Sequence, residues 1–168
     1  PERDPIKCGV WILDFSTSIT GAIAVLTALL YRSKTGKGQF IDVSQVETAI
    51  RWMDWTWIYV GLTGKNRERC GNRDFAIVPS NVYRCKDGFV ALVAFKEDEF
   101  LGLCKAMGRD DLERYRDPIT RLKSEIADEI DTAISQWCSD LEVEEICNQG
   151  RSFGFPVSPV LTFEDVYK

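Results

Sequence analysis

Histidine is absent from all 168 residues of this sequence. Without it, neither a Ser-His-Asp triad nor a Cys-His pair can be built within the chain, and histidine ligation of a metal ion is excluded. The usual proton shuttle at neutral pH is missing as well. Acid–base and nucleophilic chemistry would therefore depend on Asp, Glu, Cys, Lys, Tyr, Ser or Thr side chains.

Positive charge is scarce too. Lys and Arg total 21 against 26 Asp and Glu, which gives a net charge of −5 at pH 7. Nucleic-acid-binding domains carry a basic surface, so we expect no nucleic-acid partner. With 45 % hydrophobic and 28 % charged residues, the chain can build an apolar core as one ordinary domain or two small ones.

Cysteine pairs with metal-binding or redox spacing are also lacking. No two of the six cysteines are spaced C-x-x-C, which argues against a zinc ribbon or a thioredoxin-type site, and we predict no metal site. We expect no signal peptide, and therefore reduced cysteines and a cytoplasmic location. The longest apolar run, Ala22–Leu30, is shorter than a bilayer-spanning helix. We therefore expect no membrane partner.

Residues 1–60 predict an α/β segment. The apolar run Cys8–Leu13 is typical of a strand or extended entry that ends at Asp14. The hydroxyl side chains of residues 16–18 are candidate N-caps for a helix over Ile19–Ser33. Because this helix is apolar on nearly every side, we expect it to be well buried. Gly36 is expected to end it.

A second strand and helix are expected after this glycine. Alternation over Gln39–Val43 predicts a strand, and Ser44 with Glu47 matches a capping box. The box predicts a helix from Gln45 to about Tyr59. Its several Trp and Tyr side chains favour a core or a subunit interface over a ligand-stacking site.

The remaining sequence predicts a linker over residues 61–74 and a small α+β domain over 75–168. The linker segment has three glycines and several charges. Asp87-Gly88 between two apolar runs is a good hairpin signal. The expected elements are strands over Asn81–Cys85 and Phe89–Phe95, helices over Glu97–Met107, Arg121–Trp137 and Ser139–Gly150, an extended segment over Phe155–Val160, and a helical turn from Thr162.

Asp14 is the carboxylate whose setting points most clearly to chemistry. It precedes a buried helix, where the helix dipole and free amides favour an anion. An ionised carboxylate in an apolar cleft is poorly solvated, and this is what covalent carboxylate catalysis requires. The alternative is a helix-capping aspartate with no further role.

Two glycine-containing loops could meet an anion. Thr35–Gln39 follows a helix instead of opening one, so it fails the phosphate-loop pattern. The segment around Gly71-Asn72 is locally basic, because it contains Lys65, Arg67, Arg69 and Arg73. Cations beside these residues could bind a phosphate or a carboxylate. The alternative is a solvated loop.

Several motifs, in order, resemble the class III CoA-transferases, the formyl-CoA and carnitine CoA-transferase family. The stretch Asp14–Val43, DFSTSITGAIAVLTALLYRSKTGKGQFIDV, is similar to the family's signature of an Asp, a buried helix, an Arg and a TG-x-GQ turn. Arg69–Asn72 fits its R-x-G-N element. The P-x-x-x-Y-x-x-x-D-G and G-x-P-x-x-P-V elements are matched by Pro79, Tyr83, Asp87-Gly88 and Gly154–Val160.

This resemblance implies an α/β fold: part of a Rossmann-like CoA-transferase large domain plus a small α+β domain. It also implies that CoA moves between an acyl-CoA thioester and a carboxylic acid, with Asp14 as the nucleophile. Gly71, Asn72 and Arg73 would then contact coenzyme A, which is a substrate, and no metal is required. The implied partners are acyl-CoA and a carboxylic acid.

Two departures from the family keep alternatives open. Ser18 stands where the family often has glycine, and family members are more than twice this length, so the match lacks their first half. A truncated piece with weak or no activity is one alternative, and a non-catalytic binding or assembly module is another. An α-methylacyl-CoA racemase shares the fold and the aspartate, with Glu97 or a neighbour as its acid. Apolar surface left bare by the missing half favours a homo-oligomer, and we expect a dimer.

Overall fold

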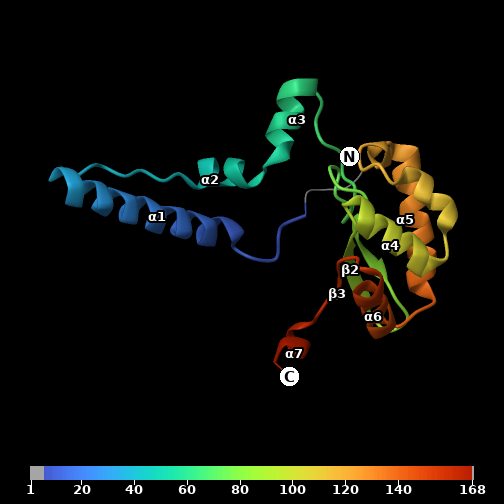
Figure 1. The fold of residues 1–168 in the computed structure, drawn as a ribbon. Coiled ribbons are helices and arrows are strands. Elements are labelled where there is room, and N and C mark those ends of the chain that lie inside the picture. The colour runs from blue at the N-terminus through green and yellow to red at the C-terminus, as the bar shows by residue number, and fades with distance from the viewer. Residues whose placement is uncertain (1–5, 168) are drawn as a thin grey trace. The chain divides into compact units, whose positions relative to one another are not determined.

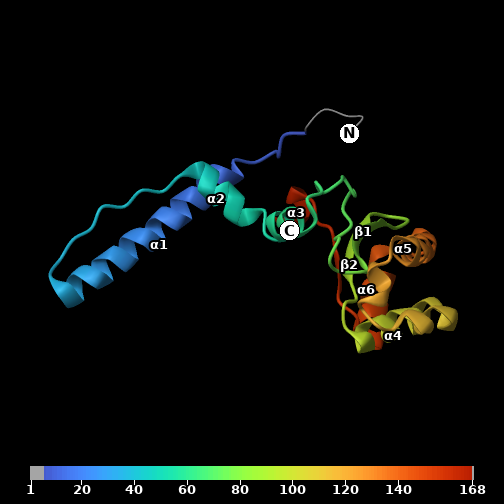
Figure 2. The same ribbon diagram turned by 90° about the horizontal axis from the view of Figure 1, so that it is seen from above.

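The computed structural model describes residues 6–167, which divide after Arg69 into two compact units. The first unit contains three helices, α1 (Ile12–Thr35), α2 (Gln45–Trp52) and α3 (Trp55–Thr63) (Figure 1). An extended segment after Gly36 runs back along α1 and places α2 beside it, as Figures 1 and 2 both show. Because α3 continues to Thr63, the first residues of the predicted linker are helical.

Helix α1 begins earlier than predicted. Trp11 is its N-cap and gives no side-chain hydrogen bond, so the expectation that residues 16–18 cap the helix is wrong. The hydroxyls of Ser16 and Ser18 donate backward within the helix instead, Ser16 Oγ to the Ile12 carbonyl and Ser18 Oγ to the Asp14 carbonyl at 2.8 Å. The end is as predicted: Gly36 has φ of +72° and its N–H donates to the Arg32 carbonyl.

Neither the strand predicted over Gln39–Val43 nor the strand alternative for Cys8–Leu13 forms. Ile12 and Leu13 belong to α1, and the segment over Gln39–Val43 is extended but unpaired. A strand needs a neighbouring strand for its backbone hydrogen bonds, and residues 6–69 offer none. A helix satisfies its own backbone groups locally, so the apolar run after Trp11 becomes helical instead.

The predicted helix over Gln45–Tyr59 is broken into two. Ser44 caps α2 as expected, since its Oγ accepts a hydrogen bond from the Glu47 N–H at 3.4 Å. The chain then turns sharply at Asp54, which has a φ of +41° and precedes α3. A left-handed residue cannot continue a right-handed helix, so two short helices result.

Apolar side chains of the first unit are exposed, contrary to the expectation of a buried helix. Ile23 and Leu26 of α1 are 61 % and 66 % exposed, and only Ser16 and Thr48 are buried among the described residues of this unit. The three helices of this unit do not cover one another's apolar sides. By length and composition alone α1 could cross a membrane, but this is weak evidence, because the core helix of a soluble protein meets the same criteria.

The second unit is built on a three-stranded antiparallel sheet in the order β1-β2-β3. The strands are β1 (Ser80–Arg84), β2 (Phe89–Val93) and β3 (Val157–Pro159). Tyr83 pairs with Val90 across the first ladder, which confirms the predicted hairpin. The extended segment after Phe155 is also confirmed, because part of it forms β3.

The helices of the second unit mostly follow the predictions. They are α4 (Glu97–Met107), α5 (Ser124–Ser139), α6 (Val143–Phe153) and the single turn α7 (Phe163–Val166), with short 3₁₀ helices at Asp110–Tyr115 and Thr120–Leu122. Helix α5 packs on β1, and α6 packs on α4 and β3 (Figure 2). The start of α5 is later than predicted, because residues 120–122 form a 3₁₀ turn.

The predicted cap of α6 is wrong. Glu142 is the N-cap and Glu145 closes the capping box, in place of Ser139 and Glu142. The helix also runs past Gly150 to Phe153, and Gly154 ends it with a φ of +79°. Gly150 lies inside the helix instead of ending it. A Cβ at this position would lie 2.2 Å from Val157 Cγ1, so α6 and the chain after Phe155 can approach this closely only because the residue is glycine.

The core of the second unit also contains a charged side chain. Arg121 is completely buried, and its guanidinium lies 4.3 Å from the centre of the Phe100 ring. Nη1 donates to the Ala94 carbonyl at 2.7 Å and Nη2 to the Phe95 carbonyl at 2.5 Å. Burial lowers the pKa of Arg121. These bonds fix the chain between β2 and α4 against the 3₁₀ turn.

We expect Gly102→Ala to destabilise the second unit. A Cβ at this position of α4 would lie 2.1 Å from the Phe153 carbonyl oxygen, so α4 and α6 must separate. Overpacking of this kind costs about 1–3 kcal/mol in the free energy of unfolding, measured by urea denaturation. Gly21→Ala in α1 is the control, because nothing lies within 4 Å of its Cβ. Equal stability of Gly102→Ala and the wild type would contradict the packing described.

The cysteines are expected to divide into two reactivity classes. Burial raises the pKa of Cys104 and of Cys138 to about 12, and Cys85 and Cys147 are buried as well. Cys8 and Cys70 are exposed. Because the thiolate is the reactive form, iodoacetamide at pH 8 should label the two exposed cysteines quickly and the other four only after unfolding. Peptide mapping by mass spectrometry measures this, and rapid labelling of native Cys104 would contradict it.

Candidate active site

Asp14 lies in the first turn of α1, three residues after the N-cap Trp11. Its side chain is exposed in this unit, as are those of Trp11 and Phe15. The Oδ1 atom accepts a hydrogen bond from Gln45 Nε2 at 3.2 Å. The carboxylate lies at the N-terminal, positive end of the helix dipole. The side chain is therefore an accessible carboxylate with a neutral amide donor beside it.

Gln45 comes to Asp14 because of where α2 begins. The Ser44 cap sets the first residue of α2, and the extended segment before it runs back along α1. The N-terminal ends of two helices thus meet at Asp14. Sequence reasoning assigned Gln45 only to a capping box, and no local pattern indicates its contact with a residue 31 positions earlier.

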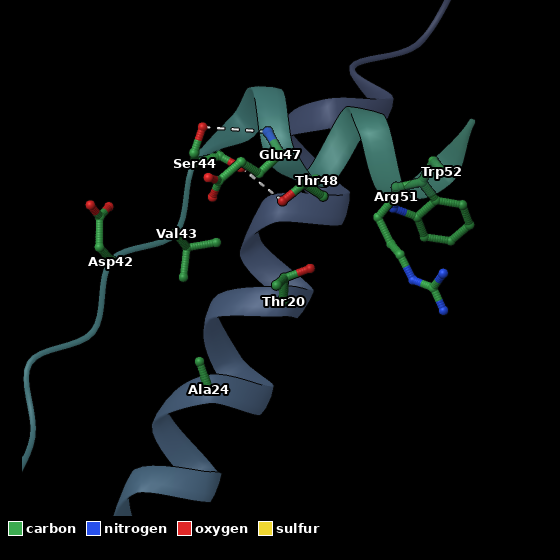
Figure 3. Close-up of a pocket in the computed structure, with 9 residues that line it drawn as sticks. All are labelled: Thr20, Ala24, Asp42, Val43, Ser44, Glu47, Thr48, Arg51 and Trp52. Atoms are coloured by element: carbon green, nitrogen blue, oxygen red, sulfur yellow. Dashed lines mark hydrogen bonds between the residues drawn. The ribbon is translucent and has the colours of Figure 1, made fainter. Parts of the chain in front are cut away.

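A pocket of about 290 Å³ lies between α1 and α2 (Figure 3). The side chains that line it come from α1, from the segment before α2 and from α2 itself: Thr20, Ala24, Asp42, Val43, Ser44, Glu47, Thr48, Arg51 and Trp52. Asp14 is not among them. Two carboxylates against one guanidinium make the lining acidic, which does not suit an anionic ligand.

Gly71, Asn72 and Arg73 lie together in one tight turn of the second unit. The Arg73 N–H donates to the Cys70 carbonyl at 3.4 Å, and Gly71 has a φ of +67° at the first central position. A positive φ there favours glycine. Gly71 and Asn72 are exposed, and nothing lies within 4 Å of a Cβ built on Gly71. Another molecule can therefore approach the backbone of this turn closely.

Arg73 holds this turn to α5. Its Nε donates to Asp131 Oδ2, and its Nη1 donates to Asp128 Oδ1 at 2.7 Å. Burial lowers the pKa of Arg73, but the hydrogen bonds and charges of Asp128 and Asp131 outweigh this and raise it above its ordinary value. The guanidinium already has two carboxylate partners within the unit.

Asp131 has a second partner, Tyr83 of β1. The buried Tyr83 hydroxyl donates to Asp131 Oδ1. Burial, and then the carboxylate charge, raise the pKa of Tyr83 far above its ordinary value. Sequence reasoning missed Asp131. The available signal was an acidic residue on the apolar side of a helix, next to Ile130 and close to Ile134.

Two other motif residues of the second unit, Asp87 and Gly154, stabilise the two ends of α6. Asp87, in the hairpin turn, accepts a hydrogen bond from the Val143 N–H at 2.9 Å and so holds the first turn of α6. Gly154 ends the same helix. Within residues 6–167, no group of three or more Cys, Asp or Glu side chains is placed to hold a metal ion.

Comparisons with known proteins agree along the whole chain. A family model described as CoA-transferase family III matches residues 1–168. The succinyl-CoA–L-malate CoA-transferase alpha subunit of Chloroflexus aurantiacus is 34 % identical over 99 % of this chain and 40 % of its own length. The succinyl-CoA:mesaconate CoA-transferase of Haloarcula marismortui is 26 % identical over 97 % of this chain and 41 % of its own length.

Solved structures are also similar to this chain over nearly its whole length. A CAIB/BAIF family protein from Brucella suis is 25 % identical with a TM-score of 0.72, over 99 % of this chain and 44 % of that one. A Mycobacterium tuberculosis protein has a TM-score of 0.79 at 20 % identity, over 100 % of this chain and 43 % of that one, and supports the fold alone. The chain thus spans about two fifths of the length of its relatives. It belongs to CoA-transferase family III.

Proposed function

We propose that this chain carries the nucleophile of a CoA-transferase that moves CoA from succinyl-CoA to a dicarboxylic acid through intermediates on Asp14. The observation that carries this proposal is the carboxylate itself. It stands accessible at a helix N-terminus with the Gln45 amide as its hydrogen-bond donor, in a chain that matches the family from end to end. A neutral donor steadies the carboxylate without neutralising its charge.

The first half of the reaction transfers CoA to Asp14. A carboxylate oxygen attacks the thioester carbonyl of succinyl-CoA, and the C–S bond breaks to give a mixed anhydride and the CoA thiolate. The thiolate then attacks the Asp14 carbonyl carbon of the anhydride. Succinate leaves, and Asp14 becomes an aspartyl-CoA thioester.

The second half of the reaction regenerates the free carboxylate of Asp14. The acceptor carboxylate attacks the aspartyl-CoA thioester and releases the CoA thiolate, leaving an anhydride between Asp14 and the acceptor. Attack of the thiolate on the acceptor carbonyl forms the new acyl-CoA and frees Asp14. Each attacking group is already an anion, so no step needs a base to remove a proton. A chain without histidine can supply this nucleophile.

The names of the relatives support the choice of substrates. Succinyl-CoA is the donor in each name, and the acceptors are L-malate, mesaconate, D-citramalate and glutarate. All four acceptors are dicarboxylic acids with a short carbon chain. We therefore propose succinyl-CoA as the donor and a four- or five-carbon dicarboxylic acid as the acceptor. Gly71 and Asn72, with an open backbone turn, are proposed to contact the CoA thioester, and Arg73 holds that turn.

The first unit is proposed to be part of a Rossmann-like large domain, and the second to be the small domain. The exposed apolar side chains of α1 support this, because apolar patches of several hundred Å² seldom remain bare. Further large-domain structure and a second copy of the protein would cover them, so we propose a homodimer. A cytoplasmic location and the absence of a membrane partner complete the proposal.

Asp14→Asn should abolish the transfer. Asparagine keeps the shape of the side chain and loses the anionic nucleophile, so we expect the rate to fall by at least about 10³-fold. The assay mixes the full-length protein with succinyl-CoA and L-malate, mesaconate or glutarate, and separates the acyl-CoA products by chromatography. Asp42→Asn is the control, because Asp42 is an exposed acid of the same unit and the hydrogen bond to Asp14 comes from Gln45 instead.

Hydroxylamine should also trap the wild-type intermediate. In the presence of succinyl-CoA it would convert Asp14 into a hydroxamate, which mass spectrometry locates. The adduct should be absent from Asp14→Asn and present in Asp42→Asn. A racemase would instead exchange the α-hydrogen of a 2-methylacyl-CoA with deuterium from the solvent. Such exchange without transfer, or full transfer by Asp14→Asn, would refute the proposal.

A further inference from the structure

We propose that Asp131 is a positioning residue for the transfer. It fixes the Cys70–Arg73 turn through Arg73, and so determines where the backbone of Gly71 and Asn72 meets the CoA thioester. This inference rests on the proposed function. The three side chains that join the turn to the sheet, Arg73, Asp131 and Tyr83, are called the Asp131 clamp below.

The burial of Asp131 is the first reason for this role. The residue is 7 % exposed and lies on the side of α5 that also carries the buried Ala127 and Ile134. A carboxylate placed there loses its water and must be compensated by a cation and by hydrogen-bond donors. Both of its oxygens are used: Oδ2 accepts from Arg73 and Oδ1 accepts from Tyr83.

The three members of the clamp differ in how firmly the fold holds them. Tyr83 is fixed by the β1–β2 ladder, where it pairs with Val90. Asp131 is fixed by α5, which packs on β1. Arg73 belongs to the turn, and the residue after it is tied to the start of β1 by the hydrogen bond from the Asp74 N–H to the Ser80 carbonyl at 3.0 Å. The clamp therefore transmits the rigidity of the sheet and α5 to the turn.

Asp128 makes a smaller contribution to holding Arg73. Its side chain is 64 % exposed, and its contact with Arg73 Nη1 lies at the surface. Exposed pairs of this kind are weak because water screens them. Asp131, with a side chain only 10 % exposed, is therefore the partner whose loss should release the turn.

Glu129 provides a closely matched control on the same helix. It too binds an arginine and a tyrosine: Oε1 accepts from Arg114 Nη2 and Oε2 from the Tyr115 hydroxyl, both at 2.8 Å. Both partners lie in the 3₁₀ helix Asp110–Tyr115 and not in the Cys70–Arg73 turn. Glu129→Gln therefore removes the same kind of charge from α5 without touching the clamp.

The test compares wild type, Asp131→Asn and Glu129→Gln as full-length proteins. Asparagine keeps the size of Asp131, but its NH2 group is a donor and faces either Arg73 or Tyr83, which also donate. Hydrogen exchange of peptides that cover residues 70–74 reports the order of the turn. Initial rates over a range of succinyl-CoA concentrations give KM and kcat, at a temperature where all variants are folded.

We expect Asp131→Asn to speed hydrogen exchange in residues 70–74 about tenfold and to raise the KM for succinyl-CoA about tenfold. The kcat should change less than threefold, because Asp14 is untouched, and hydroxylamine should still trap Asp14 at saturating succinyl-CoA. Glu129→Gln should leave both KM and exchange in residues 70–74 at wild-type values. A purely structural role would lower the amount of active protein without moving KM.

If Asp131→Asn fails to fold, a second variant tests the clamp at its residue in the turn, Arg73. Arg73→Gln removes the cation from the turn itself, and we expect the same rise in exchange and in KM. An unchanged KM in the folded variants, or an equal rise in Glu129→Gln, would overturn the inference while the proposed function stands. A wild-type protein that transfers no CoA would refute the proposed function, and the catalytic part of the inference with it, whatever the exchange data show.

Discussion

Backbone groups and apolar side chains must find partners, and this requirement explains most of the difference between the two units. The first unit has three helices and no sheet, so the side chains of α1 remain exposed. The same lack of a partner explains why Gln39–Val43 is extended and unpaired. Helices persist there because their hydrogen bonds are internal. The second unit closes a core around its own sheet.

Several family motif residues of the second unit have contacts that build the fold. Tyr83 and Asp87 both come from the hairpin, and each reaches a different helix, α5 through Asp131 and α6 through the Val143 N–H. Gly154 ends α6 and directs the chain into β3. The motifs of this unit thus connect a sheet to the helices around it. Asp14, in contrast, has a setting that suits chemistry better than packing, since it is exposed and its partner is a single amide.

Sequence reasoning succeeded where structure is determined by neighbours in the chain. The Asp87-Gly88 hairpin, helix α4 and the Thr162 turn were predicted because each depends on a few adjacent residues. The start of α1 was wrong because the choice between strand and helix there depends on whether a partner strand is present. The cap of α6 was wrong because two overlapping acidic patterns compete at residues 139–145, and the hairpin contact from Asp87 favours the later one.

The candidate site was predictable to a similar extent. Asp14 and the glycine turn came from motifs, whereas Gln45, Asp131 and Tyr83 act through contacts between residues that are 31 to 58 positions apart. Such contacts leave no periodic signal. An acidic residue within an apolar helix stripe, as at Asp131, shows only that some partner must exist.

Helix α5 carries two carboxylates that each bind an arginine and a tyrosine, and their spacing has a mechanical consequence. Glu129 and Asp131 are two residues apart, which places them about 200° apart around the helix axis. Rolling of α5 in either direction would pull one carboxylate away from its partners. The helix is therefore held against rotation about its own axis as well as against sliding, and it can serve as a fixed reference for the turn that Arg73 carries.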